Sequence, residues 1–119
     1  MRGIPLSVHG ALEMLAAPAI MVAPFLLDFG PAATIATVAV GALLLGLAVQ
    51  AEAPQPSVPV AAHAGFDFAL AAFAALSGVV IGLVSGEWYG PVFLIGVGAA
   101  QVALTVATRF SQPRGAYTR

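Results

Sequence analysis

Long apolar runs separated by short polar breaks organise the whole chain. Each run holds the roughly 20 residues that a helix needs to cross a bilayer. The runs do not alternate between apolar and polar positions, and alanine, leucine and glycine outnumber the β-branched residues, so strands are a poor interpretation. The pattern predicts an all-α membrane fold with four transmembrane helices, at about 4–27, 32–49, 60–84 and 91–108.

The breaks between the runs predict two helical hairpins. Residues 28–31 and 87–91 both end in Gly-Pro, where glycine permits a tight turn and proline suits the first turn of a helix. Three prolines between the second and third runs forbid a continuous helix there. The expected organisation is a single integral membrane domain, with hairpins at about 4–49 and 60–108, a proline-rich linker at about 50–59 and a polar tail at 109–119.

Composition excludes an ordinary soluble domain. Hydrophobic residues make up 61% of the chain and charged residues 8%, whereas about a quarter of the residues in soluble domains are charged. An apolar outer face carries no penalty in lipid, so the expected partner is the bilayer, with a homo-oligomer or a larger membrane complex left open. The net charge of −1, without any lysine, argues against nucleic acid. Cysteine is absent, which excludes disulfides and cysteine-based metal sites.

Arginine placement predicts the orientation. All four arginines lie near the chain ends, whereas the two hairpin turns carry only the acidic Asp28 and Glu87. The positive-inside rule then places both termini and the linker in the cytoplasm. The expectation is a multi-pass protein of the bacterial inner membrane.

The two halves of the chain share a short pattern. His9-Gly-Ala-Leu-Glu13 aligns with His63-Ala-Gly-Phe-Asp67, and each half later reaches a Gly-Pro turn. Two spans separate the copies, so they have the same orientation in the membrane. This self-similarity predicts an internal duplication whose pseudo-symmetry axis lies along the membrane normal.

Residues 12–48 resemble the SPW-repeat integral membrane proteins, which are small bacterial proteins built from helical hairpins. The first matching feature is a helix that ends in Ala23-Pro24-Phe25-Leu26-Leu27, followed by a short turn. The second is a following helix with Val40-Gly41-Ala42-Leu43. The Ser-Pro-Trp motif itself is represented by Ala23-Pro24-Phe25 here and by Ser77-Gly78-Val79 in the second half. The resemblance implies a membrane location and a hairpin architecture, and it carries no biochemical activity.

Two histidine–carboxylate pairs are the candidate site: His9 with Glu13, and His63 with Asp67. Residues four apart share a helix face, and ionisable groups inside a span are costly unless they are paired or wet. Three interpretations are open. The pairs can be purely structural; Glu13 and Asp67 can serve a small proton-coupled transporter; or His9 and His63 can bind haem or a metal in a redox module.

The sequence predicts no catalytic residue and no cofactor, so the leading expectation is a non-enzymatic protein with a structural or accessory role. The third run also carries Gly78, Gly82 and Gly86 at four-residue spacing. Such a series lets helix backbones approach closely, either within the bundle or between copies of the chain. Packing within the bundle is the favoured interpretation.

Overall fold

Four long helices account for most of the chain. The computed structural model describes residues 3–52 and 59–110, and within these ranges it contains four α-helices and no named strand. The helices are α1 (Leu6–Leu26), α2 (Pro31–Glu52), α3 (Val60–Ser85) and α4 (Tyr89–Ala107). Each is long and apolar enough to cross a membrane. The predicted all-α fold with four membrane-spanning helices is therefore confirmed.

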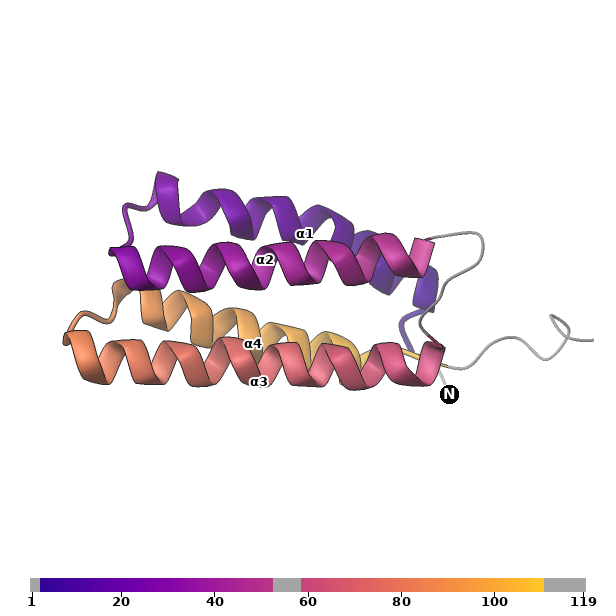
Figure 1. The fold of residues 1–119 in the computed structure, drawn as a ribbon. Coiled ribbons are helices and arrows are strands. Elements are labelled where there is room, and N and C mark those ends of the chain that lie inside the picture. The colour runs from indigo at the N-terminus through magenta and orange to yellow at the C-terminus, as the bar shows by residue number, and fades with distance from the viewer. Residues whose placement is uncertain (1–2, 53–58, 111–119) are drawn as a thin grey trace, which may run out of the picture.

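The helices lie side by side as two hairpins (Figure 1). α1 packs along α2, α3 packs along α4, and α2 and α3 make the main contact between the hairpins. No Cα atom of α1 lies within 8 Å of a Cα atom of α3, so these two helices are not packed against each other. Both hairpin turns lie at one end of the bundle, and the start of α1 lies at the other end with the close of α4 (Figure 1).

Backbone geometry explains where α1 and α3 end. Asp28 follows α1 with φ 57°, a left-handed conformation that aspartate tolerates better than most residues. Gly86 caps α3 with φ 75° and donates its N–H to the Gly82 carbonyl at 2.9 Å. Glycine is the usual residue there because it has no Cβ to clash. Both turns are therefore encoded locally.

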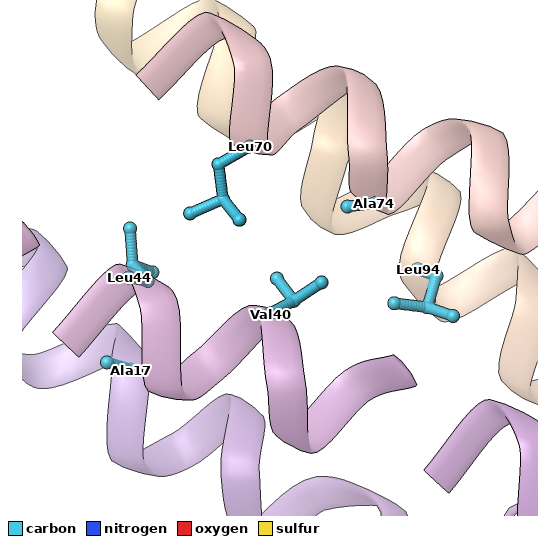
Figure 2. Packing of buried hydrophobic residues seen from close by; sticks show 6 residues of the cluster. All are labelled: Ala17, Val40, Leu44, Leu70, Ala74 and Leu94. Atoms are coloured by element: carbon cyan, nitrogen blue, oxygen red, sulfur yellow. The ribbon is translucent and has the colours of Figure 1, made fainter. Parts of the chain in front are cut away.

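Small and branched apolar side chains fill the centre of the bundle. Val40 and Leu44 of α2 point toward the side chains of α3 and α4 (Figure 2). The buried cluster consists of Ala17, Val40, Leu44, Leu70, Ala74 and Leu94. It draws on all four helices and therefore holds the hairpins together along the middle of the bundle.

The outer surface is as apolar as the core. Leu26, Leu83 and Val84 are 79%, 72% and 83% exposed, and every helix carries further exposed large apolar side chains. Soluble monomers rarely expose contiguous apolar patches larger than a few hundred Å². Lipid is the solvent that suits this surface.

The expected linker and tail differ from the structure at their edges. α2 continues to Glu52, so the first three positions of the linker predicted at 50–59 are helical. Residues 53–58 and 111–119, which hold most of the predicted linker and most of the predicted tail, lie outside the described residues. At the start of the tail, the Arg109 N–H donates to the Ile4 carbonyl at 2.9 Å, and the Ile4 N–H donates to the Ala107 carbonyl at 2.8 Å.

Candidate functional site: a buried histidine–carboxylate cluster

Two prolines set the positions of the candidate residues. Pro5 and Pro59 are the N-caps of α1 and α3, with nearly the same extended backbone (φ −61°, ψ 148° and φ −60°, ψ 152°). The N–H groups of His9 and His63 donate to the carbonyls of these prolines, at 3.0 and 2.9 Å. Each histidine therefore lies in the first turn of its helix, and its carboxylate partner lies one turn further on.

The two pairs meet in one cluster, hereafter the His–carboxylate cluster: His9, Glu13, His63 and Asp67. The expected contacts within each helix are present, since His9 Nε2 lies 2.9 Å from Glu13 Oε2 and His63 Nε2 lies 3.2 Å from Asp67 Oδ2. Contacts also cross between the helices. His9 Nε2 lies 2.9 Å from Asp67 Oδ2, and His63 Nε2 lies 3.5 Å from Glu13 Oε1. Both carboxylates are thus shared by both rings.

The cluster is buried, so the charges of its two carboxylates need compensation from nearby groups. His9, Glu13 and Asp67 are 0% exposed and His63 is 4% exposed. A carboxylate placed in a low-dielectric interior is unfavourable unless cations and hydrogen bonds compensate its charge. Within the described part of the chain, the histidines are the groups in contact with these carboxylates that can carry a positive charge.

α4 and the residue that caps it support the cluster from a third side. The Gln101 amide donates to Glu13 Oε2 at 2.7 Å. Thr108 Oγ1 lies 2.7 Å from His9 Nδ1 and donates its own proton to the Leu104 carbonyl at 2.6 Å. Because the hydroxyl proton is already used, Thr108 accepts a hydrogen bond from His9 Nδ1. The Nδ1 atom of His9 therefore carries a proton.

This assignment restricts what can lie between His9 and the carboxylates. A neutral imidazole protonated at Nδ1 has a lone pair at Nε2. That lone pair would face carboxylate oxygens of Glu13 and Asp67, both 2.9 Å away, and repel them. The arrangement is stable only with a proton or a cation between the nitrogen and the oxygens. A proton on Nε2 that makes His9 an imidazolium meets this need, as does a proton on one of the two carboxyl groups or a metal cation.

Several polar atoms of the cluster have no hydrogen-bond partner among the described residues. They are Glu13 Oε1, Asp67 Oδ1 and His63 Nε2. His63 Nε2 lies within 3.5 Å of both carboxylates but is not aligned for a hydrogen bond to either. Buried polar atoms are nearly always satisfied in folded proteins, so three such atoms in one cluster indicate spare capacity for a ligand.

The end of the bundle covers the cluster. Phe110 places its ring 5.2 Å from the His9 ring and 6.1 Å from the His63 ring, measured between centroids. Ile4 pairs with Thr108 in an isolated β-bridge, which holds the segments before α1 and after α4 together. The rings of the cluster are therefore shielded by an aromatic side chain at this end.

A side pocket of about 220 Å³ reaches the cluster between the helices. It ends on Glu13 and Gln101. All its other lining residues are apolar, namely Leu12, Ala16, Ile20, Leu44, Val97, Ala100 and Leu104. In a bilayer such a lining suits lipid rather than water.

Haem does not fit this geometry. Bis-histidine ligation needs a flat porphyrin between the two rings, with the iron bonded to both. Here Asp67 Oδ2 contacts both Nε2 atoms, at 2.9 and 3.2 Å, and the ring centroids are 5.7 Å apart with the planes at 75°. The place where the iron would lie already holds a carboxylate.

The predicted glycine series divides into different roles. A Cβ on Gly78 would lie 2.7 Å from the Pro91 carbonyl of α4, so this glycine packs two helices of one hairpin. Gly82 packs under the Trp88 ring of the following turn, where a Cβ would lie 2.3 Å from a ring carbon. Gly86 does not pack against another helix of the described bundle, because a Cβ there would meet nothing within 4 Å, and the residue acts as the helix cap.

The sequence did not predict the residues that support the cluster, nor the close packing of further glycines such as Gly41 and Gly98. Gln101, Thr108 and Phe110 were not predicted to belong to the site. Gly41 and Gly98 stand outside the four-residue series, yet a Cβ on either would clash, with Met21 Cγ at 2.4 Å and with the Ala71 carbonyl at 2.7 Å. Gln101 did leave a signal, since it is the only amide side chain inside the four predicted spans.

Comparison of the chain with protein-family models, with curated proteins and with solved structures finds no match. The chemistry of the site itself is therefore the basis on which a function can be proposed.

Proposed function

We propose that this chain is a multi-pass protein of the bacterial inner membrane with a structural or accessory role, and that it is not an enzyme. The closed state of the His–carboxylate cluster carries the proposal. Its members are at most 4% exposed and contact one another. A catalytic group has to touch its substrate. Phe110 covers the two histidine rings at the end of the bundle, and the side pocket that reaches Glu13 is otherwise lined by Gln101 and apolar side chains, which suit lipid rather than a polar substrate. The contacts within the cluster connect α1 with α3, and thus one hairpin with the other.

Both termini belong in the cytoplasm under this proposal. Arg109 lies two residues after the end of α4, at the end of the bundle where α1 begins. The remaining arginines also lie near the chain ends, and the turns at the opposite end carry Asp28 and Glu87. Positive charge flanking the spans on one side supports this orientation. The resemblance to SPW-repeat proteins supports the membrane location and the hairpin architecture, and it suggests no activity that could be transferred to this chain.

Replacing the cluster by apolar side chains of similar size tests the structural role. The variant carries His9→Leu, Glu13→Leu, His63→Leu and Asp67→Val. Well-packed apolar residues often replace a buried ionic network without loss of stability. A structural role predicts that this variant inserts into the membrane and keeps the oligomeric size of the wild type. It should also complement a strain from which the gene has been deleted. A variant that folds and inserts normally but does not complement the deletion strain would show that the polar groups perform chemistry.

A further inference from the structure

We infer that the His–carboxylate cluster binds one divalent transition-metal ion of the Zn²⁺ class, through one atom each of His9, Glu13, His63 and Asp67. The inference goes beyond the structural role proposed above. A metal-free cluster can also connect the hairpins, so the two proposals fail separately.

The positions of the ligand atoms fit a single ion. One nitrogen or oxygen from each of the four residues lies within 4.8 Å of all the others. In a tetrahedral site with bonds of about 2.0–2.2 Å, neighbouring ligand atoms are roughly 3.3–3.5 Å apart. Three of the contacts across the cluster measure 2.9, 3.2 and 3.5 Å. These three separations lie within about 0.6 Å of the tetrahedral spacing, and the widest separation in the group, at most 4.8 Å, would have to shorten by up to roughly 1.5 Å.

Two of the unsatisfied atoms, His63 Nε2 and Glu13 Oε1, belong to the contacts just given, whereas Asp67 contributes Oδ2 to those contacts and keeps Oδ1 unsatisfied. Glu13 Oε1, Asp67 Oδ1 and His63 Nε2 are buried and lack hydrogen-bond partners among the described residues. A nitrogen that lies close to two carboxylate oxygens and is aligned with neither is placed to coordinate an ion between them. The lone pair that the Thr108 contact assigns to His9 Nε2 in its neutral form supplies the second nitrogen.

The groups around the cluster have the form of an outer coordination shell. A histidine bound to a metal usually donates its other ring N–H to an oxygen, which fixes the tautomer, and bound carboxylates are themselves hydrogen-bonded. Thr108 does the first for His9, and Gln101 does the second for Glu13. These two contacts come from α4 and its cap, so three helices would combine to hold one ion.

Charge and donor type indicate the class of ion. Two carboxylates balance one divalent cation, which removes the net charge from a buried site. Two imidazole nitrogens with two carboxylate oxygens suit Zn²⁺ and related first-row ions, and the chain offers no cysteine to softer metals. Four protein ligands without an open position are typical of a structural site rather than a catalytic one.

The test uses the full chain, purified in detergent, stripped with a chelator and dialysed free of it. It is then titrated with Zn²⁺ and with Co²⁺, whose visible absorption reports tetrahedral coordination. Wild type should bind one ion per chain, develop the cobalt spectrum and melt at a higher temperature as free metal rises. Asp67→Asn and His63→Gln should lose this binding. Thr108→Val should weaken it by about 10–100-fold, the usual effect of removing an outer-shell partner.

Two controls separate a lost site from a damaged fold. Thr37→Val removes a buried hydroxyl of α2 that does not contact the cluster, and it should bind metal as the wild type does. His63→Cys introduces the only thiol into the chain. Its cobalt complex should show a sulfur-to-metal charge-transfer band, which can arise only if position 63 is a ligand. Wild-type protein that takes up less than stoichiometric metal would overturn the inference. Unchanged binding in Asp67→Asn would overturn it as well.

Discussion

His9 and Asp67 belong to different hairpins, yet His9 Nε2 lies 2.9 Å from Asp67 Oδ2. Their helices, α1 and α3, have no Cα atoms within 8 Å of each other. The connection between them at this end of the bundle is therefore made by side chains that reach across the space between the helices. The apolar core joins the hairpins along the middle of the bundle (Figure 2). The contact between His9 and Asp67 joins them near the starts of α1 and α3.

Removing the Glu13 carboxylate alone should destabilise the protein. The His9 ring and the Gln101 amide both contact Glu13 Oε2, and Glu13→Ala removes this shared acceptor. Breaking a buried ionic contact on one side typically costs about 3–5 kcal/mol. The exposed Glu87 provides the matched control, since Glu87→Ala should leave the melting temperature in detergent nearly unchanged. Equal melting temperatures for the two variants would argue against a stabilising cluster.

Two glycines of α4 should respond in opposite ways to a single added methyl group. A Cβ at Gly98 would lie 2.7 Å from the Ala71 carbonyl, whereas a Cβ at Gly96 would meet nothing within 4 Å. Gly98→Ala should cost about 1–3 kcal/mol through overpacking. Gly96→Ala should be neutral or slightly stabilising, because alanine favours helix more than glycine does. Unfolding in detergent measures both, and similar values would contradict the close packing of α3 against α4.

Reporter fusions test the orientation. A reporter active only in the cytoplasm should work when it is fused after Arg119 and when it is inserted at Gln55. It should be inactive when inserted at Glu87, because that turn lies at the opposite end of the bundle (Figure 1). Activity at Glu87 with silence at the C-terminus would reverse the proposed topology.

The helices were predictable because long apolar runs and Gly-Pro turns encode them locally. The contact within each histidine–carboxylate pair was predictable for the same reason, since residues four apart share a helix face. The meeting of the pairs depends on how α1 and α3 are rotated about their own axes. Helices that are apolar on nearly all sides, as membrane spans are, carry little information on that rotation.

Predicting that Gln101 and Thr108 support the cluster would also have required the rotation of the helices about their axes. Gln101 and Thr108 are seven positions apart, which places them on one face of a helix pattern. Nothing in the chain order shows that this face meets Glu13 and His9. The same limit applies to the glycines. Four-residue spacing predicted the packing role of Gly78, but the close packing at Gly41 depends on Met21 and Ala17 of another helix.

A double-mutant cycle between His9 and Asp67 tests most directly whether the cluster joins the two hairpins. His9→Leu, Asp67→Val and the double variant are compared with the wild type by their free energies of unfolding in detergent. A control cycle pairs Asp67→Val with Leu15→Ala, which alters an exposed side chain of α1. Direct contact predicts an interaction energy between His9 and Asp67 of about 1–3 kcal/mol, with additive losses in the control cycle. Losses that add to within about 0.5 kcal/mol in both cycles would show that the two residues do not interact, and the central claim would fall.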